Sequence, residues 1–137
     1  MSIIIRNTEY KIIKPLGKDG YDRVIQVKSK SDGKFYAIKE IIIKDEMEEN
    51  IENIKNEVNL LSKFSCNNIV KYYDSCLDKD KFYILMEYYA GQNLSDFINI
   101  NIKNNELIEE NILYNIIKQI CIGIKEIHNK NIIHRNL

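Results

Sequence analysis

The sequence predicts an α+β fold, in which a small antiparallel sheet with one helix precedes a helical segment. Short stretches rich in β-branched and aromatic residues lie between residues 10 and 89, and apolar residues at helical spacing dominate from residue 93 onward. The chain has 137 residues, of which 45% are hydrophobic and 29% are charged. These values suit one domain with a real core and argue against a disordered chain.

Three strands are expected first. Residues 10–16 and 22–28 have strand composition and are separated by a Gly-Lys-Asp-Gly turn. Asp32-Gly33 is a hairpin signal, and residues 34–43 then predict the third strand. At such close spacing the three strands form an antiparallel meander.

A helix and a second hairpin follow. Residues 69–77 and 81–89 alternate again and predict two strands. Together with the meander they give a five-stranded antiparallel sheet. Between the meander and this hairpin, residues 45–63 have apolar residues at intervals of four and three, which mark one face of a helix: Met47, Ile51, Ile54, Val58 and Leu61.

Two further helices are expected, over residues 93–102 and 109–128. The second has apolar residues on more than one side, and leaving them in water forfeits on the order of 10 kcal/mol or more of burial. We therefore expect helix 109–128 to self-associate or to bind a partner chain. The domain boundary is expected at residues 88–91, where Gly and polar residues replace the strand pattern, so that the two parts are residues 1–89 and 90–137.

Composition excludes several classes of function. Twenty Lys and Arg residues balance twenty Asp and Glu residues, so no excess charge favours nucleic acid or an anionic membrane. No apolar run approaches the roughly 20 residues of a membrane span, and nothing resembles a signal peptide, so an intracellular protein of the cytoplasm or nucleus is expected. Cys66, Cys76 and Cys121 form no C-x-x-C pair and are expected to be reduced thiols rather than zinc ligands or disulfides.

Five motifs stand in a fixed order along the chain. They are Leu16-Gly17-Lys18-Asp19-Gly20-Tyr21-Asp22-Arg23-Val24, Tyr36-Ala37-Ile38-Lys39, Glu57 in a helical pattern, Ile84-Leu85-Met86-Glu87-Tyr88, and His134-Arg135-Asn136-Leu137. This series resembles the glycine loop, lysine, helix glutamate, hinge and catalytic loop of protein kinases. Residues 119–128, residues 132–135 and the Met-Glu-Tyr-Tyr hinge are most similar to the NIMA-related serine/threonine kinases.

The resemblance covers about residues 8–137 and implies a particular organisation. Residues 1–89 resemble the N-lobe, which binds nucleotide, and residues 90–137 resemble the hinge and the first helices of a truncated C-lobe. A complete kinase domain is roughly twice as long, so the chain is expected to be its first half. ATP and a protein substrate are the ligands that the family implies, with magnesium bound only by a complete domain.

Lys39 and Glu57 are the first pair to which the resemblance gives a role. In kinases this pair holds the lysine against the α- and β-phosphates. Glu57 falls within the apolar stripe of its helix, where a carboxylate faces the protein and needs a cationic partner. The alternatives are an ordinary strand lysine with its ammonium in water and a solvated glutamate at the edge of the stripe.

The glycine loop departs from the family pattern, because its three glycine positions hold Gly17, Asp19 and Asp22. The resemblance would put these two carboxylates near triphosphate oxygens, and each contact would oppose binding by roughly 1–4 kcal/mol. A metal ion between carboxylate and phosphate would reverse the sign. Alternatively, the turn directs both carboxylates to water.

The resemblance also assigns an adenine site and a catalytic base. Val24 would cover the adenine, Met86 would be the gatekeeper, and the backbone of Glu87 and Tyr89 would form hydrogen bonds to the base. The residues that the resemblance implies around the nucleotide are Leu16, Gly17, Val24, Ala37, Lys39, Met86, Glu87 and Tyr89. Asn136 stands where kinases have the catalytic Asp. An amide has no useful basicity, and general-base assistance is typically worth 10²–10⁴-fold.

We therefore expect a segment of a serine/threonine kinase domain that is not catalytically competent as it stands and binds ATP weakly or not at all. Three explanations of how the chain ends, at Asn136-Leu137, are open at this point. The chain is a pseudokinase segment, an active kinase that was cut and mutated, or a short non-enzymatic scaffold that acts through protein contacts. The departures in the glycine loop favour the first explanation over the second.

Overall fold

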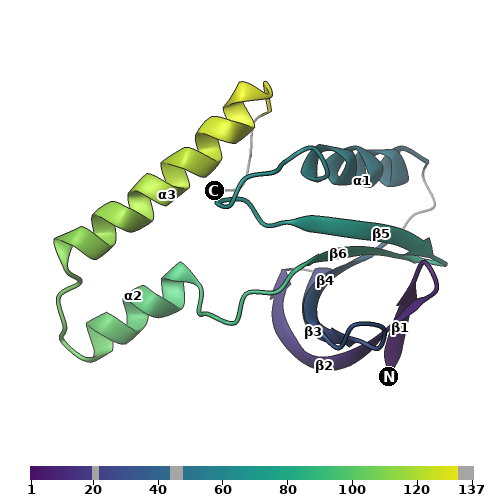
Figure 1. Ribbon diagram of the computed structural model, residues 1–137, viewed down its shortest axis with the longest axis horizontal. Coiled ribbons are helices and arrows are strands. Elements are labelled where there is room, and N and C mark those ends of the chain that lie inside the picture. The colour runs from purple at the N-terminus through teal and green to yellow at the C-terminus, as the bar shows by residue number, and fades with distance from the viewer. Residues whose placement is uncertain (20–21, 44–47, 133–137) are drawn as a thin grey trace. The chain divides into compact units, whose positions relative to one another are not determined.

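The computed structural model describes residues 1–19, 22–43 and 48–132, and the chain forms two compact units. Residues 1–65 and 70–89 make the first unit, and residues 66–69 and 90–137 make the second (Figure 1). The side chains of Asp19 and of several residues in the first helix, Glu57 among them, lie outside the described part.

The first unit contains a six-stranded antiparallel sheet and one helix. The strand order is β1-β2-β3-β4-β6-β5. The α+β prediction is therefore confirmed, although the sheet has one strand more than the five predicted. The strands are β1 (Ser2–Ile5), β2 (Thr8–Asp19), β3 (Asp22–Ser29), β4 (Phe35–Ile42), β5 (Tyr72–Asp78) and β6 (Lys81–Glu87).

β1 is the strand that the sequence prediction missed. Arg6 and Asn7 have φ angles of 40° and 68°, and Ile5 pairs with Thr8 across this two-residue turn. Two consecutive positive φ values match the twist of antiparallel strands, but Arg-Asn is a weak signal compared with Asn-Gly. Ile3 and Ile5 are buried whereas Ile4 is exposed, which is the alternation of a strand with one face in the core.

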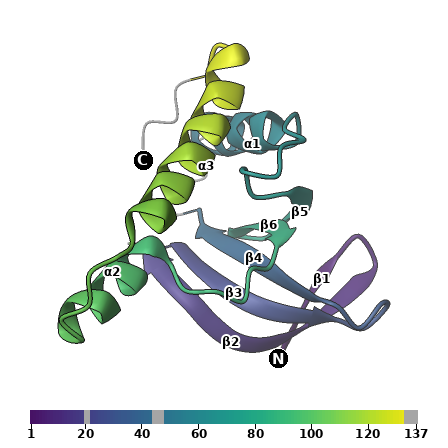
Figure 2. The ribbon, with the colours of Figure 1, turned by 60° about the vertical axis from the view of Figure 1, so that its left-hand side comes forward.

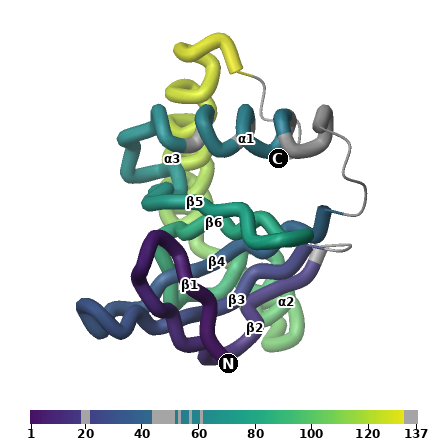
Figure 3. The backbone as a smooth tube through the Cα atoms, turned by 90° about the vertical axis from the view of Figure 1, so that its right-hand side faces the viewer, coloured from purple at the N-terminus to yellow at the C-terminus, as the bar shows by residue number. Residues whose placement is uncertain are grey.

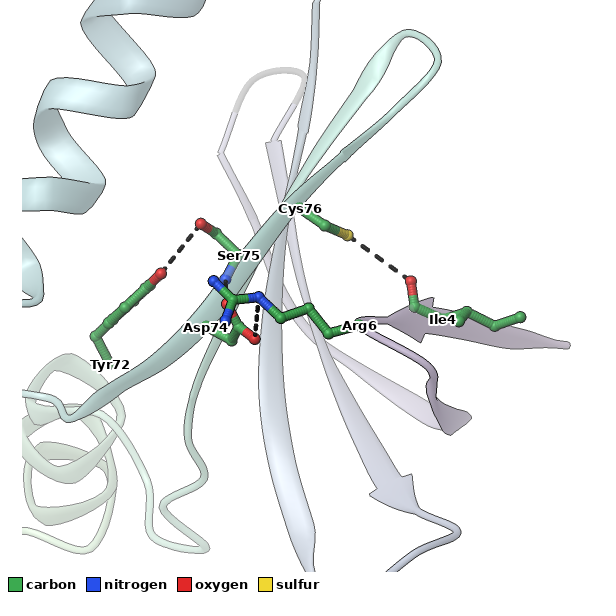
Figure 4. A network of polar contacts seen from close by, with 6 residues as sticks. All are labelled: Ile4, Arg6, Tyr72, Asp74, Ser75 and Cys76. Atoms are coloured by element: carbon green, nitrogen blue, oxygen red, sulfur yellow. Dashed lines mark hydrogen bonds and ion pairs between the residues drawn. The ribbon is translucent and has the colours of Figure 1, made fainter.

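The sheet curls so that its two edge strands meet (Figures 3 and 4). Arg6 Nε lies 3.0 Å from Asp74 Oδ2, and the Cys76 thiol donates to the carbonyl oxygen of Ile4 at 3.7 Å. These contacts join β1 and the turn after it to β5, although β1 and β5 are not hydrogen-bonded neighbours in the sheet. Closure of this kind protects edge strands from pairing with other chains.

The curled sheet encloses the main apolar core of the first unit. Val27 and Ile38 are completely buried, and Tyr10 packs edge-on against Tyr36 with ring centroids 5.8 Å apart. Burying side chains of this size contributes roughly 1.5–3 kcal/mol each. The buried members of this core are Ile3, Ile5, Tyr10, Ile25, Val27, Ile38, Tyr83 and Leu85.

Helix α1 (Glu48–Leu61) covers the opposite face of the sheet, over β5 and β6 (Figure 1). Ile54 and Val58 belong to a second apolar cluster with Phe82 and Ile84. Their spacing of four residues puts both on one side of the helix, which is the stripe that the sequence predicts. The predicted start of this helix, at residues 45–47, lies outside the described residues.

The second unit contains helices α2 (Leu94–Lys103) and α3 (Glu110–Asn129) (Figure 2). Asn93 caps α2, since its Oδ1 accepts a hydrogen bond from the N–H of Asp96 at 2.7 Å. Gly123 of α3 is buried, and a Cβ atom there would stand 2.9 Å from the carbonyl oxygen of Asn68. This close approach explains a glycine inside a helix, where it is otherwise unfavourable.

Candidate nucleotide-binding face

The strand register gathers five of the predicted nucleotide residues on one face of the sheet. Gly17 pairs with Val24, Val24 pairs with Lys39, and Ala37 pairs with Met86. Residues directly opposite each other in a sheet point to the same side, as do residues two apart in one strand. Here, "the lysine face" denotes this surface, made of Gly17, Val24, Ala37, Lys39 and Met86.

The lysine face is the side of the sheet that α1 covers. Lys39 pairs directly with Ile84, which is fully buried in the cluster beneath α1, and Met86 packs at the edge of the same cluster. Val58, one residue after Glu57, belongs to this cluster as well. The Glu57 side chain lies outside the described residues, so the Lys39–Glu57 pair stays a prediction.

Lys39 has an ion-pair partner at the end of the β2–β3 hairpin. Its Nζ lies 3.7 Å from Oδ2 of Asp22, and the two side chains are 30% and 32% exposed. Partial exposure to water screens the pair, so its contribution to stability is about 1 kcal/mol or less. The pair matters more for ligand binding than for stability, because the Lys39 ammonium, which the kinase resemblance assigns to phosphate, is already paired with the Asp22 carboxylate.

Gly17 lies in an irregular part of β2. The register shifts between Pro15 and Gly17, so Leu16 is the extra residue of a bulge and is 41% exposed. A Cβ atom at Gly17 would meet nothing within 4 Å, so packing does not require glycine there. Open space above a glycine backbone is what the approach of a ligand needs. Asp19 pairs with Asp22 in the strand register, and residues 20–21 lie outside the described part.

The predicted hinge residues continue from β6. The N–H of Glu87 donates to the carbonyl oxygen of Lys71 at 2.9 Å, and Tyr89 Oη donates to Glu87 Oε2 at 2.9 Å. Burial and the Glu87 carboxylate raise the pKa of the Tyr89 hydroxyl, so the hydroxyl stays protonated and remains a donor. This contact holds together the segment whose backbone, according to the kinase resemblance, would bind adenine.

The opposite face of the same strands holds a charged cluster that sequence reasoning missed. Arg23 Nε lies 2.7 Å from Glu40 Oε1, Arg23 Nη2 donates to Glu40 Oε2 at 3.1 Å, and Lys81 Nζ lies 3.6 Å from that oxygen. The Glu40 side chain is only 3% exposed. The alternation of Arg23 with Val24, and of Glu40 with Lys39, would have placed both charges on one face.

The electrostatics of this cluster follow from burial. Burial alone would raise the pKa of the Glu40 carboxyl, but the bonds from Arg23 and the charge of Lys81 outweigh it and hold this pKa below its ordinary value. Burial and the Glu40 charge raise the pKa of Tyr83 to about 12. The cluster lines an open cavity of about 310 Å³ together with Lys18 and Ile42. The Glu40 carboxylate already balances much of the positive charge of this cluster.

Two other predicted features concern the catalytic loop and metals. His134, Arg135, Asn136 and Leu137 lie outside the described residues. Among the residues that the structure describes, no group of three or more His, Cys, Asp or Glu side chains is placed to hold a metal ion. The three cysteines are free thiols, and no helix in the described part is long and apolar enough to cross a membrane.

Comparison with known proteins decides the family. The family model described as the protein kinase domain matches residues 10–137. The chain belongs to the protein kinase family. The lysine face therefore lies in the part of the chain that matches this family, and its Lys39 is the lysine of the motif on which the resemblance rests.

Several relatives that the chain is similar to are NIMA-related serine/threonine kinases. The chain is 34% identical over 134 residues to the probable serine/threonine-protein kinase nek2 of Dictyostelium discoideum, with 94% of this chain and 32% of that protein covered. The probable kinase nek3 of the same organism is 38% identical, with 94% and 12% covered. Nek2 of Mus musculus is 31% identical, with 96% and 31% covered. The predicted subgroup is confirmed, and the chain spans about a third or less of these relatives.

The charged cluster gives a prediction for stability. Arg23→Met should lower the free energy of unfolding by roughly 2–4 kcal/mol, because the buried Glu40 carboxylate loses its nearest cation. The carboxylate keeps the more distant ammonium of Lys81 and the hydroxyl of Tyr83. Urea denaturation followed by circular dichroism measures this change. Lys30→Met is the matched control, since Lys30 pairs with Glu9 at 2.7 Å on the surface and its loss should be undetectable.

The same pair predicts a pH dependence. Since the pKa of Glu40 is lowered on folding, its contribution is complete above the unfolded pKa of about 4.3 and is lost as the pH falls through the lower folded value. The difference between wild type and Arg23→Met should therefore shrink in acid. Equal losses for the Arg23 and Lys30 variants at neutral pH would contradict the assignment.

Proposed function

We propose that this chain is the nucleotide-binding lobe of a NIMA-related serine/threonine kinase domain, over residues 1–89, with part of the helical lobe over residues 90–137. The lysine face carries this proposal, because Lys39 stands among residues that the resemblance puts around ATP. Phosphoryl transfer from ATP to protein hydroxyls is the corresponding reaction of the complete domain. A location in the cytoplasm or nucleus is part of the proposal.

The residues of the proposed site have separate roles. Val24, Ala37 and Met86 would contact the adenine, and Glu87 and Tyr89 would bond to it through their backbone. Leu16 and Gly17 would lie over the sugar and phosphates, while Lys39, oriented by Glu57, would bind the α- and β-phosphates. Magnesium belongs to the chemistry of the complete domain, where it neutralises charge on the phosphates.

We propose further that phosphoryl transfer is weak or absent. Asn136 stands at the position of the catalytic base, and its amide cannot accept the proton of a substrate hydroxyl. Asp22 at a glycine position and its contact with Lys39 support weak nucleotide binding as well. A pseudokinase that acts by protein contacts is thus the second candidate function, and the surface of α3 favours it.

That surface is apolar over much of the helix. Only Gly123 and Ile127 of α3 are buried, whereas Ile117 is 59% exposed. The exposed large hydrophobic residues of this helix are Ile112, Leu113, Tyr114, Ile117, Ile120 and Ile122. Such a patch is typical of a surface that binds another chain. We propose that a second copy or a partner protein covers it.

Nucleotide binding is tested by thermal unfolding. Mg-ATP at about ten times its Kd should raise the melting temperature of the chain by about 5 °C, because a ligand at this concentration stabilises the fold by about 1.4 kcal/mol. Lys39→Ala should abolish the shift, and Lys34→Ala, an exposed lysine of the β3–β4 turn, should preserve it. No shift at millimolar nucleotide would leave the scaffold function as the better proposal.

The role of Asn136 is tested in the complete protein. Asn136→Asp should raise phosphoryl transfer to a general kinase substrate by roughly 10²–10⁴-fold, since it restores a base. Transfer of γ-³²P from ATP measures the rate, and Asn136→Ala is the control that should stay at the background level. If the protein with Asn136 already matches the Asp variant, the inactivity proposal is wrong.

Self-association is tested by light scattering on the 137-residue chain. We expect a dimer or larger species at about 100 µM, because burial of the α3 surface stabilises the assembly. Ile117→Lys should shift the chain to a monomer, whereas Asn115→Lys, on the same helix, should have a smaller effect. A monodisperse wild-type monomer would count against self-association.

A further inference from the structure

The ion pair between Lys39 and Asp22 sets up a competition at the lysine face. Both side chains lie on this face, 3.7 Å apart, and each is about one-third exposed. We propose that Asp22 is a specificity-determining residue, which selects against the phosphate groups of a nucleotide and leaves the affinity for adenosine unchanged. This inference rests on the proposed nucleotide site.

The competition follows from charge and distance. A phosphate group that binds the Lys39 ammonium must approach it as closely as Asp22 does. Two anions then share one ammonium, and their mutual repulsion at about 4 Å opposes binding unless Asp22 moves away. In either case the cost falls on ligands that carry phosphate.

The adenosine part of a ligand would not meet this carboxylate. Ala37 and Met86 pair with each other two residues along their strands from Lys39 and Ile84. Two residues in a strand span about 6.6 Å, directed away from the hairpin end at which Asp22 stands. Asp22 therefore acts on the phosphates and not on the base.

The nearest cation in sequence does not neutralise Asp22. Arg23 points to the opposite face, where Glu40 holds its guanidinium at 2.7 Å. The strand alternation enforces this separation, since adjacent residues of β3 face opposite sides. The Asp22 charge thus remains available to repel a phosphate at the lysine face.

The experiment compares adenosine, ADP and ATP on the 137-residue chain by isothermal titration calorimetry. EDTA is present so that no divalent cation bridges carboxylate and phosphate. Asp22→Asn removes the charge and keeps the shape, and it should tighten ATP binding about 10-fold while the adenosine affinity changes less than about 2-fold. Asp78→Asn, an exposed residue at the end of β5, removes the same charge and should change neither affinity.

A second variant guards against a local change of shape. Asp22→Gly restores the residue that kinases have at this position, and it should give the same gain for ATP over adenosine. Raising the salt concentration from ~0.05 to ~0.5 M should reduce the gain in both variants, because the repulsion is screened. A circular dichroism melt of each variant verifies that it is folded.

The outcomes separate this inference from the proposed function. If wild type binds adenosine and the ATP-to-adenosine ratio is the same in wild type and both Asp22 variants, the inference is overturned and the nucleotide site stands. Equal tightening of adenosine and ATP likewise overturns it, because Asp22 then acts on the shape of the site. If no variant binds any of the three ligands, the nucleotide site itself is wrong and the inference fails with it.

Discussion

The pairing of β3 with β4 determines where the charged side chains of the first unit point. Val24 opposite Lys39 and Arg23 opposite Glu40 are consecutive pairs of one register. A slip of one residue would turn Lys39 toward the core and Glu40 toward the lysine face. The pair of Arg23 with the buried Glu40 and the completely buried Val27 and Ile38 oppose that slip. The core side of the sheet therefore determines which side chains lie on the other side.

The same alternation divides the apolar residues between two clusters. On β4, Ile38 belongs to the core inside the curled sheet, whereas Ile41 packs with the cluster under α1. Lys39 therefore stands at the border of a cluster that a helix covers. Packing thus positions the lysine for which we propose a role in nucleotide binding, since Ile54 and Val58 hold helix α1 against Ile84.

Much of this organisation could be read from the sequence because it depends on local periodicity. The strands containing Val24 and Lys39 and the helices α1, α2 and α3 follow from alternation, helical spacing and turn residues. The strand β1 could not, because Arg6-Asn7 has little turn preference. The side chains of β5 that contact β1 across the curled sheet are also some 70 residues away in the sequence, as for Cys76 and Ile4. The contact of Asp22 with Lys39 was also out of reach, since side-chain contacts across strands depend on the register of β3 with β4, which local periodicity does not determine.

Asp22 stands at a position where kinases have glycine, and it is the residue at which we propose that the fold and a phosphate ligand compete. At a hairpin end, an aspartate gains a partner in Lys39 and costs the sheet little. For a ligand that carries phosphate, the same contact occupies the Lys39 ammonium, which is the group proposed to bind the phosphate. Natural sequences break local rules chiefly at functional sites, where a gain in one property offsets a loss in another. Here the gain goes to the fold without a ligand. The Asp22 carboxylate stabilises the strand end, and a nucleotide would have to displace it from Lys39. The proposed role of Asp22 predicts a site that favours ligands without phosphate, which supports the second candidate function, a protein that acts through contacts of its surface.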